Sequence, residues 1–245
     1  MRCAIVTGGG TGIGRATALR LAQGGHAVVV AGRRREPLED ATRAIIAGGG
    51  RAIAVTADVA RVEQVVDMVR QSVDAFGRID VLVNNAGGAS NVAIATLSDE
   101  QWHDTLNVNL SSAFYATRAV WPVMQRQFQA MKASPKPEGG VIVNISSMAS
   151  KDPFPGLGIY ATAKAALNMF TLVTAREGHA VGIRAVCIAP GAVNTGMFRG
   201  VMGDRPIPEG IALEPADIAE MIDQVVNGPL RHCSGDTLFI HRKPI

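Results

Sequence analysis

Two side chains in the second half of the chain have types and spacing suited to proton transfer. Tyr160 and Lys164 stand four residues apart, and Ser147 precedes the tyrosine by thirteen. Positions i and i+4 share one face of a helix, so the phenol and the ammonium would reach the same small volume. A free tyrosine has a pKa of about 10, but a cation beside it favours the phenolate and lowers that pKa. Taken alone, this spacing fits an ordinary helix face better than a catalytic pair, so the rest of the chain must decide.

Composition places the chain among ordinary globular proteins. It has 245 residues, 47% of them hydrophobic and 18% charged, with a net charge of +3. That balance allows a sizeable core and gives no reason to expect a nucleic-acid partner. The three cysteines form no paired framework and the five histidines no metal-ligand spacing, which indicates a reduced compartment without a metal site. We find no membrane-spanning run and no room for a signal peptide, so we expect a soluble, cytoplasmic protein that binds no membrane.

Short apolar runs alternate with longer amphipathic segments along the chain. The runs that predict strands are 4–6, 27–31, 52–55, 79–83, 141–145, 183–188 and 237–240. Helices are expected over 11–23, from about Pro37, over 62–76, twice between 98 and 132, and around 160–164. Apolar strands that are each followed by a helix predict an α/β fold. We expect one Rossmann-type domain over 1–245, a doubly wound parallel sheet of about seven strands. The polar segment 132–140 is either a surface loop or a partner-binding loop.

A glycine-rich loop joins the first expected strand to the first helix. It runs from Thr7 to Gly14 and reads Thr-Gly-Gly-Gly-Thr-Gly-Ile-Gly. An open α/β sheet binds a dinucleotide pyrophosphate at this place, on backbone N–H groups at the start of a helix. The general G-x-G-x-x-G spacing is absent, and Thr-Gly-x-x-x-Gly-x-Gly fits instead. Glycines there let phosphates approach the backbone closely, although a flexible strand–helix turn would read similarly.

Further motifs follow in an order that is specific to one family. They are Asn84-Asn-Ala-Gly87, Asn107-Val-Asn-Leu110, Ser147, Tyr160-x-x-x-Lys164 and Pro190-Gly191. With the glycine loop, these motifs identify the chain as a member of the short-chain dehydrogenases/reductases, resembling the 3-oxoacyl-ACP reductase-like members. The resemblance covers roughly four fifths of the chain, from the first strand to about residue 195.

The resemblance implies a role for each catalytic position. Tyr160 would be the acid/base that gives a proton to a carbonyl oxygen or takes one from an alcohol. Lys164 would lower the pKa of that tyrosine and bind the nicotinamide ribose. Ser147 would steady the substrate oxygen, its spacing to the tyrosine selecting it over Ser146, and Asn109 would hold a water of a proton relay.

The resemblance also implies a set of coenzyme-binding residues. Besides Tyr160 and Lys164, they are Thr7, Gly8, Thr11, Gly12, Ile13, Gly14, Arg33, Asp58, Val59, Asn85, Ala86, Gly87, Pro190, Gly191, Val193 and Thr195. Asp58 would contact the adenine amino group, or else cap a helix. The Thr195 hydroxyl, with the backbone of Val193, would hold the carboxamide, or else cap the next helix.

The end of the second strand bears on the choice of coenzyme. An acid there would bind the ribose 2′-hydroxyl, whereas arginine accommodates a 2′-phosphate. Gly32 occupies the expected acidic position and Arg33 follows it, so we predict NADP(H). NAD(H) stays open because Glu36 could serve as the ribose acid, and because Thr11 stands where many NADP-using relatives have a basic residue.

Substrate identity is expected to depend on three loops, 88–95, 149–158 and 196–212. Their apolar side chains either line a pocket or pack within their own loops: Phe154, Leu157, Met197, Phe198 and Met202. A small-molecule carbonyl or alcohol is expected, for example a medium-sized ketone or a 3-oxoacyl thioester, while sugar, steroid and xenobiotic carbonyls stay open. The resemblance further implies a homodimer or homotetramer through helices at 111–131 and 159–176, although the C-terminus lacks the family's usual Gly-Gly.

The sequence as a whole predicts an NADP(H)-dependent carbonyl reductase or alcohol dehydrogenase. The alternatives are an NAD(H)-dependent alcohol dehydrogenase of the same family and a nicotinamide-binding regulator without turnover. The presence of the complete set Asn109, Ser147, Tyr160 and Lys164 argues against the regulator, because a binder has no need of the tyrosine proton.

Overall fold

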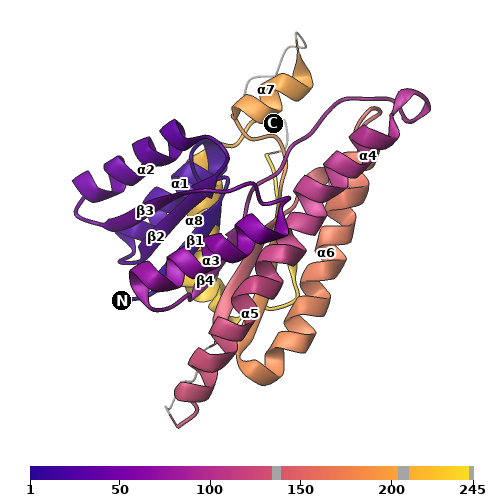
Figure 1. The fold of residues 1–245 in the computed structure, drawn as a ribbon. Helices are drawn as coiled ribbons and strands as arrows, with labels where there is room; N and C mark the ends of the chain where they lie inside the picture. The colour runs from indigo at the N-terminus through magenta and orange to yellow at the C-terminus, as the bar shows by residue number, and fades with distance from the viewer. Residues whose placement is uncertain (134–138, 204–209, 243–245) are drawn as a thin grey trace.

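One parallel β-sheet forms the centre of the molecule (Figure 1). The computed structural model describes residues 1–133, 139–203 and 210–242. Within these ranges, seven strands follow the order β3-β2-β1-β4-β5-β6-β7, and every neighbouring pair is parallel. The strands are β1 (Cys3–Thr7), β2 (Ala27–Gly32), β3 (Arg51–Thr56), β4 (Val81–Asn84), β5 (Gly140–Ile145), β6 (Ile183–Pro190) and β7 (Thr237–Ile240). The predicted doubly wound parallel sheet is confirmed.

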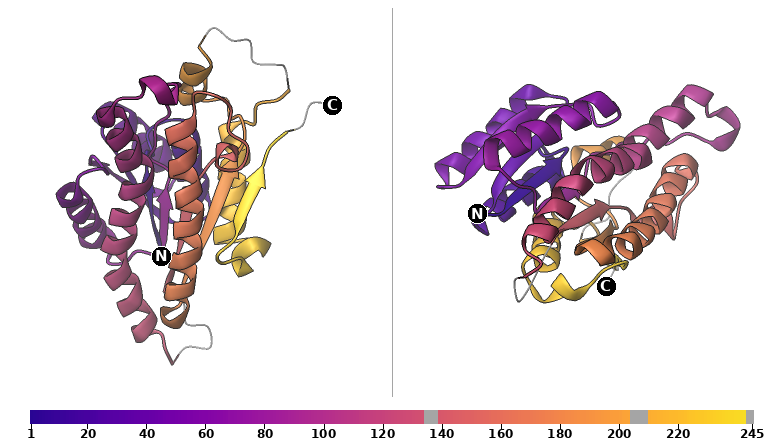
Figure 2. Two further views of the ribbon diagram at one scale, coloured as in Figure 1. Left: turned by 90° about the vertical axis from the view of Figure 1, so that its right-hand side faces the viewer. Right: turned by 60° about the horizontal axis from the view of Figure 1, so that its bottom comes forward.

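Helices cover both faces of this sheet (Figure 2). The longer ones are α1 (Gly12–Gln23), α2 (Arg35–Ala47), α3 (Val62–Phe76), α4 (Asp99–Leu106), α5 (Ser112–Ala130), α6 (Gly158–Gly178), α7 (Gly196–Met202) and α8 (Pro215–Val226). Short helical turns are η1 (Ile94–Thr96), η2 (Asn107–Ser111), η3 (Met148–Ser150), η4 (His179–Val181) and η5 (Pro229–His232). Helices α1, α2 and α8 pack on one face, and α3, α5 and α6 pack on the other.

The side chains of β1 show why both layers form. Ala4 and Val6 belong to the core cluster beneath α1 and α8, whereas Cys3 and Ile5 belong to the cluster beneath α3 and α5. All four are fully buried. Successive strand residues point to opposite faces, so a strand covered on both sides must be apolar throughout. The continuous apolar runs in the sequence therefore indicate a sheet that is covered by helices on both faces.

Two local differences from the sequence-based expectation have simple causes. Helix α2 begins at Arg35, so Pro37 is its third residue, not its first. A proline is tolerated there because N–H groups of the first turn have no acceptor within the helix. The expected loop 196–212 contains helix α7, which Thr195 caps by accepting a hydrogen bond from the Phe198 N–H at 3.2 Å. Of the polar loop 132–140, residues 134–138 lie outside the described ranges.

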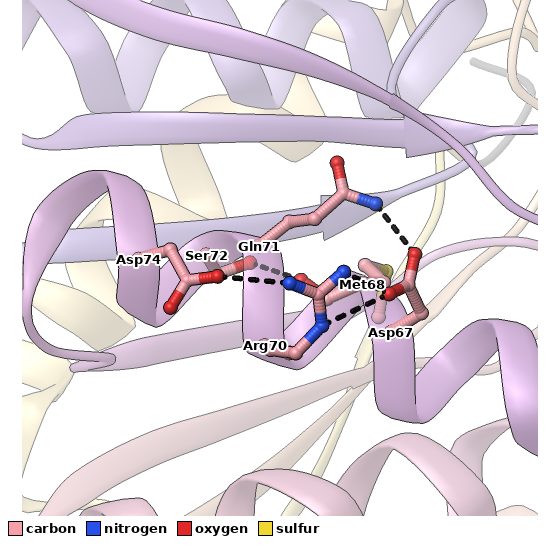
Figure 3. A network of polar contacts seen from close by, with 6 residues as sticks. All are labelled: Asp67, Met68, Arg70, Gln71, Ser72 and Asp74. Carbon is pink, nitrogen blue, oxygen red and sulfur yellow. Dashed lines mark hydrogen bonds and ion pairs between the residues drawn. The ribbon is translucent and has the colours of Figure 1, made fainter.

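Helix α3 illustrates how the outer layer meets solvent. Its inner face buries Val65 and Met68, while Arg70 on the outer face forms ion pairs with Asp67 and Asp74 (Figure 3). These pairs are exposed, and ion pairs of that kind add little to stability. The buried side chains of α3, not its surface ion pairs, therefore hold the helix against the sheet. No helix in the described ranges is long and apolar enough to span a membrane.

Candidate active site

The carboxyl ends of the strands form the edge at which a ligand would bind. All strands are parallel, so these ends meet at one edge, and the strand order reverses between β1 and β4. Ligands of open α/β sheets bind in the crevice at such a reversal. Helix α7 lies over this edge, at the top of Figure 1. The segments after β1, β4, β5 and β6 carry most of the predicted site residues to it.

Helix α6 carries both predicted proton-transfer residues in its first two turns. Tyr160 and Lys164 share one face of it, with the lysine Nζ 5.6 Å from the centre of the tyrosine ring. Lys164 is 4% exposed, and its ammonium donates a hydrogen bond of 2.8 Å to the Ile145 carbonyl at the end of β5. The Ser146 hydroxyl donates to the Lys164 carbonyl at 3.1 Å. These two bonds fix the helix against the end of β5.

Burial dominates the acid–base properties of this pair. It lowers the pKa of the Lys164 ammonium to about 8, because a charge is poorly solvated there. Burial also raises the pKa of the Tyr160 phenol, while a hydrogen bond with the Ser147 side chain acts in the opposite direction. The predicted lowering of the tyrosine pKa by Lys164 does not appear here, because burial dominates and the net direction of the Tyr160 pKa is upward. The phenol keeps its proton at neutral pH, which is the form that donates to a carbonyl oxygen.

Asn109 and Ser147 approach the same space from other elements. Asn109 lies in η2, a single π-helical turn between α4 and α5, and such turns are frequent at functional sites. Its amide donates hydrogen bonds to the carbonyls of Gly88 and Thr105, at 2.8 and 3.0 Å. Ser147 follows β5, and its hydroxyl accepts a hydrogen bond from the Ala149 N–H at 3.2 Å.

Gly87 marks the point where Asn109 and Lys164 converge. A Cβ added to Gly87 would lie 2.8 Å from the Asn109 Oδ1 and 3.5 Å from the Lys164 Nζ. The first distance is too short for an ordinary contact, so a larger residue at this position would displace the Asn109 amide. The structure thus brings together two predicted residues that are 55 positions apart in sequence.

The four predicted catalytic residues line one cavity of about 290 Å³. Phe154, Leu157, Met197 and Phe198 line it as well, as the apolar-pocket interpretation predicts. Met202 does not, and Val201 takes its place, because positions 197 and 201 share one face of α7. Sequence reasoning missed the lining residues Ile145, Met148 and Ala192, and it included Ala89, Ala149 and Asp152 only as parts of the expected substrate loops. The missed residues stand within two positions of Ser147 or between Gly191 and Val193, and this proximity to recognised motifs was the available signal.

A longer groove of about 980 Å³ adjoins the cavity. The two share Ile13, Asn85, Gly87, Thr195 and Met197, so they form one continuous cleft. The other residues lining the groove are Gly8, Thr11, Gly12, Gly32, Arg33, Arg34, Ala57, Asp58, Val59, Ala86, Val108 and Gly196. Pro190, Gly191 and Val193 line the cavity rather than the groove. Most of the predicted coenzyme-binding residues therefore surround this cleft.

Thr7 and Gly14, both predicted to bind coenzyme, do not line it. The Thr7 hydroxyl donates to the Val83 carbonyl at 3.2 Å and accepts from the Asn85 N–H at 3.0 Å. It therefore ties β1 to the loop after β4. A Cβ on Gly14 would collide with the Gly8 carbonyl oxygen, so glycine is needed for the tight turn itself. Both residues support the backbone that forms the groove without lining it themselves.

The glycine loop fits the approach of a dinucleotide. Gly8 and Gly12 have φ values of +65° and +52°, in the left-handed region that favours glycine. A Cβ on Gly12 would come within 3.2 Å of the Thr195 side chain across the groove. The loop precedes the N-terminus of α1, where N–H groups and the helix dipole favour phosphate.

The arginine run after β2 divides between two environments. Arg33 and Arg34 line the groove, and both are exposed. Arg35 instead forms an ion pair with Glu39 on α2, with 2.6 Å between its Nε and the Glu39 Oε1. Glu36 lies in the first turn of α2 and does not line the groove, so nothing in its placement favours it as the ribose acid.

For Asp58 and Thr195 the sequence predicts either a contact with the coenzyme or a helix cap, and the structure separates the two residues. The Asp58 carboxylate accepts a hydrogen bond from the Ala60 N–H at 3.0 Å, while the N-cap of α3 is Arg61. The helix-cap interpretation of Asp58 is therefore wrong, and its side chain stays at the groove. The cap interpretation of Thr195 is confirmed, and the residue also lines the groove and the cavity, where it is accessible to a ligand.

A dinucleotide groove that opens onto a cavity with a protonated phenol is the arrangement of a nicotinamide-dependent oxidoreductase. The family model of the short chain dehydrogenases matches residues 2–205, and the chain belongs to this family. It is therefore an oxidoreductase that acts on CH–OH or C=O groups with a nicotinamide coenzyme.

Relatives and solved structures agree with this assignment. The 3-oxoacyl-[acyl-carrier-protein] reductase of Synechocystis sp. is 37% identical over 231 residues, which cover 92% of this chain and 89% of that protein. The 3-ketoacyl-(acyl-carrier-protein) reductase of Brucella melitensis, complexed with NADH, has a TM-score of 0.89 at 27% identity over 98% and 96% of the two chains. The alcohol dehydrogenase of the archaeon Thermococcus sibiricus, complexed with 5-hydroxy-NADP, has a TM-score of 0.86 at 26% identity over 100% and 99%.

Proposed function

We propose that residues 1–245 form one nicotinamide-binding domain that interconverts a small ketone or aldehyde and its alcohol with NADP(H). The observation that carries the proposal is the convergence of Asn109, Ser147, Tyr160 and Lys164 on a cavity continuous with the dinucleotide groove. When bound, the nicotinamide supplies or accepts the hydride. The side chains then have to orient the carbonyl and move one proton.

Each of these side chains is held in a state that suits its proposed task. Tyr160 donates the proton during reduction, since burial keeps its phenol protonated at neutral pH. Ser147, whose side chain hydrogen-bonds with that of Tyr160, orients the same substrate oxygen. Lys164 is anchored on the Ile145 carbonyl and Asn109 on Gly88 and Thr105, so neither needs to be ordered on binding. Such preorganisation is what makes positioned groups effective in catalysis.

The cavity favours a compact, uncharged carbonyl compound. Apart from Lys164, the charged side chain that lines it among the described residues is Asp152, at its exposed rim. The remaining walls are largely apolar, and the volume of about 290 Å³ lies at the low end of the roughly 300–1,000 Å³ typical of ligand pockets. A small ketone or the 3-oxoacyl end of a thioester satisfies these conditions.

The activity is tested with a panel of carbonyl compounds and alcohols, assayed by nicotinamide absorbance with both coenzymes. On the best substrate, Tyr160→Phe should lower kcat by about 10²–10⁴, the usual loss on removing an acid/base group. The Kd of the coenzyme should stay within about twofold (below ~0.4 kcal/mol), because the ring is retained. A variant with near-full kcat would show that Tyr160 is not the proton donor.

The two arginines that follow β2 support the preference for NADP(H) over NAD(H). Arg33 and Arg34 bring two guanidinium groups to the groove where Gly32 replaces a ribose-binding acid. Arginine binds phosphate through a planar, charged fork. Solved relatives contain either NADH or an NADP derivative, so the preference has to come from these residues of the chain itself.

Arg33→Asp should reverse that preference. We expect the ratio of kcat/KM with NADPH to kcat/KM with NADH to fall at least about tenfold, equivalent to ~1.4 kcal/mol. Arg35→Asp is the matched control, because Arg35 pairs with Glu39 outside the groove, and it should leave the ratio unchanged. A ratio that barely moves in Arg33→Asp would remove this residue as the discriminator.

We also propose association into a homodimer or homotetramer through α5 and α6, which lie side by side along one flank of the molecule (Figure 2). Phe114 on α5 and Met169 and Val173 on α6 are 40%, 60% and 40% exposed. Phe114 and Val173 also line a groove of about 490 Å³ between the two helices, together with Trp121 and Phe170. Contiguous exposed apolar surface of this kind marks an association site.

A further inference from the structure

We infer that Asn168 is a positioning residue that fixes the turn carrying Ser147 against helix α6. This inference rests on the proposed role of Ser147 in orienting the substrate oxygen. Asn168 follows Lys164 by four residues and Tyr160 by eight, so all three lie along one face of α6. The same helix face thus carries the proton donor, the buried amine and a side-chain amide.

The Asn168 amide joins three elements through hydrogen bonds. Its Nδ2 donates to the Ser150 hydroxyl at 2.9 Å, and that hydroxyl donates to the Ser147 carbonyl at 2.7 Å. Its Oδ1 accepts from the thiol of Cys187, which is fully buried in β6, at 3.2 Å. Helix α6, the turn η3 and strand β6 are therefore connected through one side chain.

An amide suits this position because it donates and accepts at the same time. Leucine has a similar size and could do neither. Without the Asn168 donor, the Ser150 hydroxyl keeps its bond to the Ser147 carbonyl within the same turn, and this side-chain tie between η3 and α6 is lost. In the proposed reaction, the Ser147 hydroxyl and the Tyr160 phenol both hydrogen-bond to the same carbonyl oxygen of the substrate. Displacing the Ser147 hydroxyl by about 1 Å can therefore lower the rate by a factor of the order of 10².

A double-mutant cycle tests this role. Asn168→Leu should lower kcat about tenfold (~1.4 kcal/mol) on the best panel substrate, while the KM of the coenzyme stays within about twofold. Ser150→Ala should reproduce the loss of kcat, since it breaks the same connection. In a Ser147→Ala background, neither substitution should cause a further loss, because the hydroxyl that they position is already gone.

Thr162→Val is the matched control on the same helix. Among the described residues, its exposed hydroxyl bonds only to the Gly158 carbonyl one turn earlier, at 2.9 Å, so kcat should not change. Equal losses in the wild-type and Ser147→Ala backgrounds would assign Asn168 to fold stability and overturn the inference, as would full activity of Asn168→Leu. If that variant does not fold, the Ser150→Ala cycle decides in the same way. Full activity of Ser147→Ala alone would instead remove the proposed role of Ser147.

Discussion

At the scale of single residues, burial decides the chemistry of the candidate site. A tyrosine and a lysine four positions apart predict a phenol made acidic by its neighbour. In the structure the Lys164 amine is engaged by the Ile145 carbonyl, and desolvation raises the pKa of Tyr160. The phenol is therefore in the protonated form that the proposed reduction requires. The spacing predicted that the two groups lie close together, but desolvation decides whether the Tyr160 pKa rises or falls.

The buried amine should leave a signature in the pH dependence of stability. The pKa of Lys164 is about 8 in the folded chain, against an ordinary value of 10.5. Below about pH 8 both states carry the proton, and folding includes the cost of burying a charge. Between the two values the unfolded chain binds more protons, so the contribution of Lys164 to stability rises with pH.

Comparison with Lys164→Met isolates this effect. The free energy of unfolding of the wild type minus that of the variant should increase by up to about 3 kcal/mol from pH 8 to pH 10.5. Urea unfolding at several pH values measures it, and titrating groups remote from Lys164 cancel in the difference. A difference that is constant over this range, or that falls with pH, would contradict a buried, readily deprotonated amine.

At the scale of elements, the site depends on where strands end and helices begin. The turn from β1 into α1 requires glycine at position 14, because any Cβ there meets the Gly8 carbonyl. Helix α6 supplies Tyr160, Lys164 and Asn168 from one face. The π-helical turn at Asn107–Ser111 interrupts the long helical stretch at the place where Asn109 faces the cavity.

Helix α7 forms part of the wall of the substrate cavity. The segment reads as a loop in the sequence, yet Thr195 caps a helix there. Helical periodicity then presents Met197 and Val201 to the cavity and leaves Met202 out of its lining. Specificity variants of this segment should therefore be those at Met197, Phe198 and Val201, which share one side of the helix.

At the scale of the whole molecule, the flank formed by α5 and α6 governs the proposed assembly. Met169→Asp combined with Val173→Asp would place two charges on this apolar surface. We expect the variant to sediment as a monomer, because burying unpaired charges in an interface costs more than the contact returns. Sedimentation or light scattering at several concentrations measures the mass.

Ile46→Asp is the matched control for that experiment. Ile46 is 54% exposed on α2, on the opposite face of the sheet, so the assembly should keep its mass. A double variant with the same mass as the wild type would place the association surface elsewhere. Loss of assembly in the control would show that the charge acts non-specifically.

Local patterns in the sequence determined the fold class, the glycine loop and the meeting of Tyr160 with Lys164. Periodicity and i,i+4 spacing act over a few residues, so they can be recognised without tertiary information. The tertiary structure alone decided that Thr7 supports the groove from behind, that Val201 replaces Met202, and that Asn168 reaches the Ser147 turn. It also decided the direction of the Tyr160 pKa. Contacts and desolvation depend on segments that are distant along the chain, and only packing brings those segments together.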